Sequence, residues 1–216
     1  MIKIMNKGDE FPDPRLATES GLVAIGGDLS PETILKAYKK GIFPWYSEGD
    51  PILWWSPDPR MVLYPKDLKI SRSLKKVLKK NKFTITFNRD FPSVIKMCAK
   101  TPRKGQDGTW ILPEIIQAYT KLHEMGYAHS VEAYIGDELV GGLYGVVIGK
   151  VFFGESMFSK VSDASKVAFV HLVEKLKNEG FHFIDCQVSS HHLARFGAIE
   201  IPRDRFLKEL QEAIKS

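Results

Sequence analysis

A series of strand-like segments joined by two-residue turns constrains the fold of this chain more than any other feature. The segments cover residues 130–135, 138–148 and 151–154, and the turns between them are Gly136-Asp137 and Gly149-Lys150. Turns this short can connect only antiparallel neighbours, because a parallel connection needs a crossover of roughly a dozen residues or more. The sequence therefore predicts an antiparallel meander of three strands.

A long helix and one further strand follow the meander. Ser162 is a suitable N-cap for a helix over 163–179, Gly180 ends that helix, and 181–186 is the next predicted strand. A meander followed by a long helix and a strand is the core pattern of the N-acetyltransferase (GNAT-like) fold. The analogy concerns the fold alone and implies no substrate.

The residues on either side of this pattern predict further elements. Helices are expected at 70–80, 91–99, 113–125 and 203–214, and a strand is expected at 83–88. Elements in this order pack as a mixed, mostly antiparallel sheet flanked by helices on both faces. We therefore expect an α/β (α+β) protein.

The first 63 residues differ from the rest because they are rich in Pro, Gly and Trp. One helix is expected there, over 31–40, between an N-cap at Ser30 and a terminating Gly41. The remainder of the region predicts short strands and loops. We therefore expect a small N-terminal domain over 1–63 and the GNAT-like domain over 64–216.

The positive charge of the chain is concentrated in one segment. Between Lys66 and Lys82 there are eight basic residues and one acid, Asp67, so the segment carries +7, whereas the whole chain carries +5. Such a segment is either a solvated surface or a contact for a polyanion, nucleic acid or anionic membrane. The candidate contact residues are Lys69, Arg72, Lys76, Lys79 and Lys80.

Membrane and secreted classes are not expected. The longest uncharged apolar stretch, 139–149, has 11 residues, and a membrane-spanning helix needs roughly 18 or more. The residues at the N-terminus are too charged for a secretory leader. The two cysteines, Cys98 and Cys186, are typical of reduced thiols rather than of a disulfide framework. A cytoplasmic protein is expected.

One acid stands in an apolar setting where a predicted strand ends. Glu155 lies within Phe152-Phe-Gly-Glu-Ser-Met-Phe-Ser159. A carboxyl group with such neighbours has a perturbed pKa or a positive partner, unless it faces solvent at the strand end. Glu155 is therefore a candidate functional group.

Asp185 and Gln187 form a second polar pair. They are two residues apart, so on a regular strand their side chains share a face. A buried acid beside a buried amide suggests a hydrogen-bonded network, and an ordinary loop contact is the alternative. Cys186 would then point to the opposite face. Its spacing to His191 and His192 matches no common zinc pattern, so no metal is expected.

The four tryptophans lie in loop-rich sequence. Trp45, Trp54, Trp55 and Trp110 are each more typical of a core than of a ligand site. Trp110 is the best site candidate, because it follows the glycine-containing run 103–109 and could form the wall of an apolar pocket there.

Blocks of sequence in a fixed order resemble one known family. They are Gly21–Pro31, Gly41–Trp45 and Trp54-Trp-Ser-Pro-Asp-Pro-Arg60, then Gly154–Ser159 with Ala164–Lys166, then Ile184–Gln187 with Gly197-Ala198 and Glu200–Arg203. The chain is similar, over nearly its whole length, to the bacterial leucyl/phenylalanyl-tRNA–protein transferases. The block that ends at Arg60 is the most specific. Asp163 is a departure, since the family usually has Asn there, but Asp is acceptable at a helix start.

The resemblance implies an activity and a set of partners. The family moves Leu, Phe or Met from aminoacyl-tRNA to the N-terminal Arg or Lys of a protein and so marks that protein for degradation, without metal or cofactor. Its conserved acid corresponds to Glu155, its Asp-x-Gln pair to Asp185 and Gln187, and its pocket tryptophan to Trp110. A monomer is expected. The alternatives are a CoA-dependent N-acetyltransferase and a non-catalytic RNA-binding protein.

Elementary chemistry adds expectations to the resemblance. The donor is already an activated ester, so the enzyme must mainly align it with an amine and accept one proton. The family mechanism gives that proton to Gln187, but an amide is a very weak base, so we expect Asp185 to receive it, directly or through Gln187. Glu155 is expected to orient the donor. The pocket residues expected to select the aminoacyl side chain are Trp110, Phe152, Phe153 and Trp45.

Overall fold

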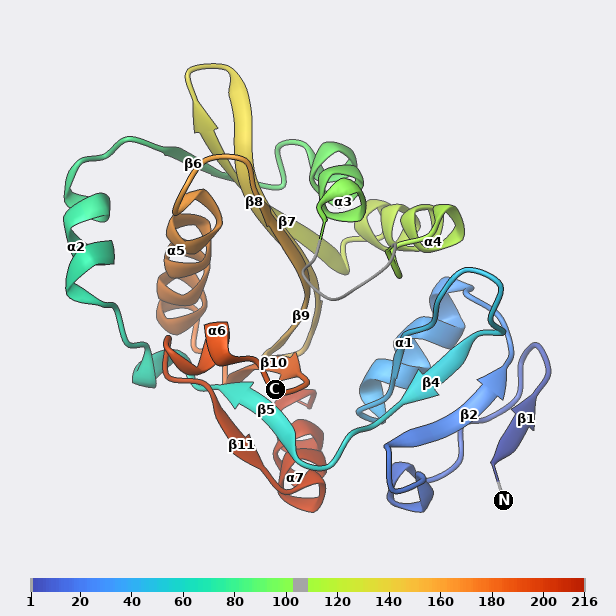
Figure 1. Cartoon of the computed structure of the whole chain (residues 1–216). Helices are drawn as coiled ribbons and strands as arrows, with labels where there is room; N and C mark the ends of the chain where they lie inside the picture. The colour runs from blue at the N-terminus through green and yellow to red at the C-terminus, as the bar shows by residue number, and fades with distance from the viewer. Residues whose placement is uncertain (1, 103–108, 216) are drawn as a thin grey trace.

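The structure is a computed structural model, and it describes residues 2–102 and 109–215. Two sheets organise it (Figure 1). The smaller sheet has the strand order β1-β2-β4-β3 and the larger one the order β11-β5-β10-β9-β8-β7-β6. The run 103–108, which precedes Trp110, lies outside the described residues.

The N-terminal unit contains the smaller sheet and one helix. Its elements are β1 (Lys3–Met5), β2 (Leu22–Gly26), α1 (Pro31–Lys39), β3 (Phe43–Pro44) and β4 (Leu53–Trp55), with a short 3₁₀ helix at Pro14–Leu16. The predicted helix over 31–40 is confirmed. Ser30 accepts a hydrogen bond from the Thr33 N–H, and Gly41 has a φ of +74° beyond the helix end.

The larger sheet is built around the predicted meander. Its strands are β5 (Arg60–Leu63), β6 (Thr84–Phe87), β7 (Ala128–Ile135), β8 (Glu138–Ile148), β9 (Val151–Ser159), β10 (Phe183–Gln187) and β11 (Ile199–Ile201). β7, β8 and β9 are antiparallel neighbours, and β10 pairs parallel to β9. β9 continues five residues past its predicted end at Gly154, because its pairing with β8 resumes after a register shift.

Helices cover both faces of the larger sheet (Figure 1). α2 (Arg72–Lys79) and α5 (Ala164–Asn178) lie on one face, and α3 (Phe91–Lys100) and α4 (Pro113–Glu124) lie on the other. Two helices follow β10, α6 (His191–Ala194) and α7 (Arg203–Ala213). α5 packs closely on the meander, since a methyl group added at Gly141 would lie 2.5 Å from Cβ of Ala164. The predicted GNAT-like arrangement of meander, long helix and strand is confirmed.

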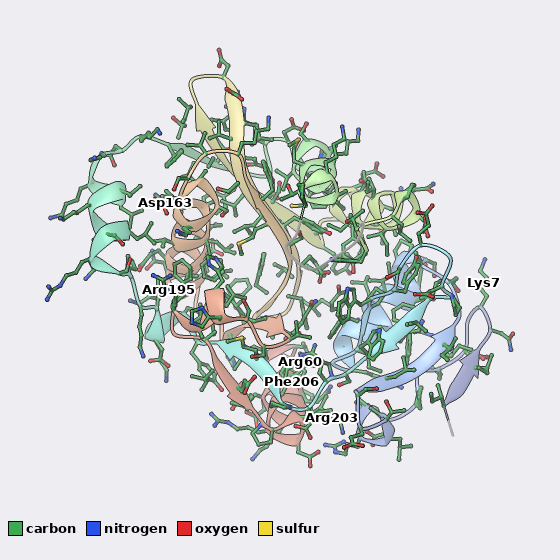
Figure 2. All side chains as sticks on the ribbon, in the orientation of Figure 1. Lys7, Arg60, Asp163, Arg195, Arg203 and Phe206 are labelled. Carbon is green, nitrogen blue, oxygen red and sulfur yellow. The ribbon has the colours of Figure 1, made fainter. Side chains whose placement is uncertain are left out.

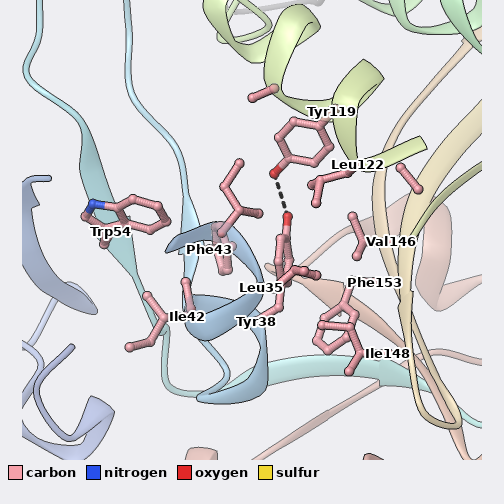
Figure 3. Packing of buried hydrophobic residues seen from close by; sticks show 14 of the residues in the cluster. Leu35, Tyr38, Ile42, Phe43, Trp54, Tyr119, Leu122, Val146, Ile148 and Phe153 are labelled. Carbon is pink, nitrogen blue, oxygen red and sulfur yellow. Dashed lines mark hydrogen bonds between the residues drawn. The ribbon is translucent and has the colours of Figure 1, made fainter. Parts of the chain in front are cut away.

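The two units share a continuous core. Strand β5, which the sequence-based division at residue 63 assigned to the N-terminal unit, pairs with β10 and β11 of the larger sheet. One cluster of buried apolar side chains contains Tyr38 and Trp54 from the first unit and Phe153 and Phe206 from the second. Figure 3 shows the packing at this contact, where the hydroxyls of Tyr38 and Tyr119 meet.

Candidate active site

A pocket of about 320 Å³ lies where β9 and β10 part. The two strands are paired from Phe183 and Val151 to Asp185 and Phe153, and the pairing ends there. The larger part of the lining is apolar and comes from β8, β9, β10, α5 and the segment after α1; it includes Phe43, Trp45, Leu143, Phe152, Met157 and Phe169. The space beyond the last strand pair is therefore an apolar site with few polar groups.

Five of the seven residues predicted for catalysis or for the aminoacyl pocket meet at this pocket. Trp45, Trp110, Phe152, Glu155 and Gln187 all line it. Trp45 is 39% exposed, so it lies at the rim, and its carbonyl accepts a hydrogen bond of 2.6 Å from the Trp55 indole.

Two predicted site residues lie behind the pocket instead of in its wall. Phe153 packs against the ring of Tyr38, at 4.9 Å between centroids, because neighbouring side chains on a strand point to opposite faces. Asp185 is fully buried and is also absent from the lining. Cys186 is buried as expected but lines the pocket, and burial raises the pKa of its thiol.

Glu155 is the carboxyl group of the pocket, and two side chains donate to it. Its Oε1 accepts hydrogen bonds from the Tyr38 hydroxyl at 2.5 Å and from Nε2 of Gln187 at 3.0 Å. Burial raises the pKa of Glu155 to about 8, although the Tyr38 hydrogen bond lowers it. Of the alternatives that the sequence leaves open for Glu155, the structure favours a perturbed pKa, and burial is its cause. A pKa of about 8 means that Glu155 is mostly protonated at neutral pH.

Two tyrosines complete this network, and the sequence reasoning missed both. Tyr38 of α1 and Tyr119 of α4 are 2.6 Å apart at their hydroxyls and are fully buried. Burial raises the pKa of both phenols well above the ordinary value, so both remain donors. The available signal was weak: each tyrosine lies on the apolar face of a predicted helix, where it would be assigned to the core.

Asp185 is held by a buried arginine. Its Oδ2 accepts from Nη2 of Arg60 at 2.7 Å, and its Oδ1 accepts from Nε of Arg60 at 2.8 Å. The side chains of Arg60 and Asp185 are both 0% exposed. Nη1 of Arg60 donates to the Gly41 carbonyl at 3.1 Å. The most specific sequence block thus ends in a residue that contacts the Asp-x-Gln pair directly.

Gln187 does not continue the strand in a regular way. Its φ is +66°, and the register of β10 against β5 shifts between Asp185 and Gln187. Its backbone N–H donates to Oδ1 of Asp185 at 2.9 Å, while its side-chain amide donates to Glu155. The expected polar network exists. Asp185 contacts the backbone N–H of Gln187, however, and the two side chains do not pair on one face of a regular strand.

The basic residues lie apart from this pocket. All eight, from Lys66 to Lys82, are exposed, and none forms an ion pair within residues 2–102 and 109–215. α2 is anchored by buried Leu74 and packs beside α5 (Figure 1).

In the part of the chain that the structure describes, no helix is long and apolar enough to cross a membrane. No group of three or more possible metal ligands is found there.

The start of α5 does not offer a free cradle for a pyrophosphate. The N–H of Ala164 donates to the carbonyl of Val161, and the N–H of Ser165 donates to Oγ of Ser159. The N–H of Val167 donates to the carbonyl of Asp163. Amides that are already used inside the chain are poorly suited to binding phosphate oxygens. This geometry does not favour a CoA-dependent N-acetyltransferase.

The fold and the site define an acyltransferase. A GNAT-like sheet parts around an apolar pocket, and a carboxyl, an amide and two phenols meet beside it. The sequence comparisons specify the family. The family model for the leucyl/phenylalanyl-tRNA protein transferase matches residues 62–211, and the model for its N-terminal domain matches residues 27–58. The chain belongs to this family and is an aminoacyltransferase.

Curated relatives agree with the family models. The chain is 56% identical over 216 residues to a leucyl/phenylalanyl-tRNA–protein transferase of Nitrosospira multiformis, which covers 99% of this chain and 93% of the relative. It is 59% identical over 204 residues to one of Syntrophobacter fumaroxidans, covering 94% and 87%.

Solved structures show a weaker likeness. An aminoglycoside acetyltransferase from an uncultured soil metagenomic sample has a TM-score of 0.40 at 15% identity, over 55% of this chain and 86% of the other. L-PGS from Bacillus licheniformis has a TM-score of 0.43 at 13% identity, over 78% and 53%. These similarities are too weak to bear on the activity.

Proposed function

We propose that this aminoacyltransferase moves Leu, Phe and, less efficiently, Met from aminoacyl-tRNA to the α-amine of an N-terminal Arg or Lys of another protein. The product carries a destabilising N-terminus and is directed to proteolysis, and the enzyme acts as a cytoplasmic monomer. The observation that carries the proposal is the apolar pocket with Glu155 in its wall, in a member of this family.

The pocket suits the side chain of the donor aminoacyl group. Its apolar wall includes Leu143, Phe152, Met157 and Phe169, and its volume of about 320 Å³ has room for a Leu or Phe side chain. Such a pocket favours side chains that are unbranched at Cβ, such as those of Leu and Phe. It discriminates by only roughly 1–3 kcal/mol per methylene, so Met is admitted as well.

Glu155 is placed to handle charge at the reacting amine. Its pKa of about 8 is close to the ordinary pKa of an α-amine, also about 8. Groups with matched pKa values exchange a proton at little cost, so Glu155 as carboxylate can accept the proton that the attacking amine releases. Tyr38 and Gln187 hold its Oε1 and fix the orientation of the carboxyl group.

The basic face of α2, together with the basic residues on either side of this helix, supplies the contact to tRNA. Lys69, Arg72, Lys76, Lys79 and Lys80 are exposed. Contacts from such a face go to phosphate oxygens, which give affinity and orientation with little sequence reading. Binding would then depend strongly on salt.

The test is a transfer assay with two acceptors. Purified protein is incubated with radiolabelled Leu-tRNA and a peptide that begins with Arg, beside a peptide of the same sequence that begins with Ala. Label on the Arg peptide alone supports the proposal. No transfer to either peptide, followed by acetylation of an amine from labelled acetyl-CoA, would replace it with the acetyltransferase alternative. Tight, salt-sensitive tRNA binding without any transfer would indicate an RNA-binding protein.

A further inference from the structure

We propose that Arg60 is a positioning residue of the transfer reaction. Its guanidinium fixes Asp185, Asp185 fixes the backbone of Gln187, and Gln187 thereby reaches Glu155. The role of Asp185 is to hold this chain of contacts and not to accept the proton of the attacking amine. The inference rests on the proposed function, because it assigns roles within that reaction.

The contact between Arg60 and Asp185 leaves the carboxylate little freedom. Two guanidinium nitrogens bind its two oxygens, at 2.8 and 2.7 Å. Such a bidentate pair fixes the plane of the carboxylate as well as its position. Because both side chains are completely buried, neither can exchange its partner for water.

Arg60 also joins the two units of the chain. Its guanidinium lies 4.8 Å from the ring centroid of Phe43, just after α1, and 4.4 Å from that of Phe206 on α7. The Gly41 carbonyl accepts a hydrogen bond from the remaining guanidinium nitrogen, Nη1. Figure 2 shows Arg60, the first residue of β5, beside Phe206, near the N-terminal unit. The position of Asp185 is therefore set by both units together.

Gln187 needs this support because its backbone is in an unfavourable region. A φ of +66° is uncommon for a residue with a side chain. The hydrogen bond from its N–H to Oδ1 of Asp185 favours the turn, and the turn brings Nε2 to 3.0 Å from Oε1 of Glu155. If the backbone at Gln187 were extended, Nε2 would be displaced from Glu155, and Glu155 would lose this hydrogen bond.

The same contacts argue against Asp185 as the proton acceptor. Its Oδ1 already accepts two hydrogen bonds, and its Oδ2 accepts one from a cation. The carboxylate is 0% exposed and does not line the pocket. A general base must come within hydrogen-bond reach of the proton that it takes. Glu155, which lines the pocket, satisfies this requirement and Asp185 does not.

The deciding experiment compares R60Q, D185N and the double variant R60Q/D185N in Leu transfer. Each single variant leaves a buried group without its charged partner, so we expect kcat to fall at least tenfold while KM for Leu-tRNA stays within twofold. The double variant replaces the ion pair by two amides that can still hydrogen-bond to each other and to the Gln187 N–H. We expect its kcat to recover to within about fivefold of the unmodified enzyme.

The opposite result would overturn the proposal. If Asp185 is the base, the double variant lacks the carboxylate that accepts the proton, so its kcat stays as low as that of D185N. R203Q/D185N is the matched control, since Arg203 binds the Ser56 carbonyl in the same region and does not contact Asp185. Recovery in this control as well would show general stabilisation and would also contradict the proposal.

Folding is checked by circular dichroism and thermal unfolding of every variant. If the single variants do not fold, the double variant decides alone, because a folded double variant with kcat reduced a hundredfold or more contradicts the proposal. If the double variant does not fold either, R60K decides, since Lys keeps the charge and loses the bidentate fork. We expect kcat of R60K to fall at unchanged KM, and an unaltered kcat would overturn the proposal. Absence of transfer by the unmodified enzyme would refute the proposed function itself.

Discussion

The Tyr38 hydroxyl lies 2.5 Å from Oε1 of Glu155, and this contact joins the N-terminal unit to a central strand of the larger sheet. Tyr38 belongs to α1 and Glu155 to β9, so the environment of the pocket carboxyl is set across the boundary between the two units. The N-terminal unit is therefore part of the site and not an accessory to it.

Replacing Tyr38 by Phe should shift the pH dependence of transfer upward. The Tyr38 hydrogen bond lowers the pKa of Glu155, so its loss raises that pKa further. Activity that requires the Glu155 carboxylate then appears at higher pH. We also expect kcat at pH 7.5 to fall by roughly three- to tenfold, the effect of one hydrogen bond. The measurement is the single-turnover rate of Leu transfer from pH 6 to 9.

Y119F is the control for this prediction. Tyr119 contacts the Tyr38 hydroxyl at 2.6 Å, so its change should move the profile in the same direction by a smaller amount. Superimposable profiles for Y38F and the unmodified enzyme would show that the contact does not control Glu155.

Glu155 should also make stability depend on pH. Its pKa is about 8 in the folded protein and about 4.5 in the unfolded chain, so the folded state holds an additional proton between these values. The associated stability is fully present below pH 4.5 and is lost as the pH rises through 8. The amide in E155Q does not titrate, so this variant lacks the pH-dependent contribution. Relative to E155Q, the unmodified protein should lose roughly 1–3 kcal/mol of unfolding free energy between pH 5.5 and 8.5.

Urea unfolding at these two pH values measures the difference. Other ionisable groups contribute equally to both proteins. The informative quantity is therefore the change, between the two pH values, in the difference between the unfolding free energies of the two proteins. Parallel pH dependence of the two proteins would mean that Glu155 is not protonated in the folded state at neutral pH.

Local signals made much of the fold predictable. The meander follows from tight turns at Gly136 and Gly149, and α1 follows from Ser30 and Gly41, because the turns and caps of a chain are formed by neighbours in sequence. The same locality explains why Glu155 could be identified as a perturbed acid from its apolar neighbours alone.

The details of the site depend on contacts that no local pattern contains. Tyr38 meets Tyr119 only because α1 packs on α4, and Arg60 meets Asp185 only because β5 pairs with β10. No glycine marks the turn at Gln187 in the sequence. The alternation of side chains along a strand therefore predicts a regular strand there. The cause of the turn is a hydrogen bond to Asp185, which becomes visible only when the strand is placed.

Phe152 and Phe153 offer a matched pair for testing the pocket. Phe152 lines it, whereas Phe153 packs against Tyr38 on the other face of β9. F152L enlarges the pocket, so we expect kcat/KM for Phe-tRNA relative to Leu-tRNA to rise by roughly three- to tenfold, within the range of one methylene-sized change. F153L should leave this ratio within twofold. Competition between the two charged tRNAs measures it, and equal shifts in both variants would remove Phe152 from the selecting wall.

Charge reversal on α2 tests the proposed contact to tRNA. The triple variant R72E/K76E/K79E removes three exposed cations from the basic face. We expect tRNA affinity to fall at least tenfold in 0.1 M salt. The slope of log K against log salt should decrease by roughly two to three units, because each lost phosphate contact removes about one released counterion.

The control reverses three exposed lysines elsewhere, in K7E/K39E/K208E. Both triple variants change the net charge by the same amount, so a general electrostatic attraction would weaken equally in both. Filter binding across a salt series separates these cases. A local contact requires the slope to change only in the α2 variant, and equal slopes for the two triple variants would exclude α2 as the tRNA-binding face.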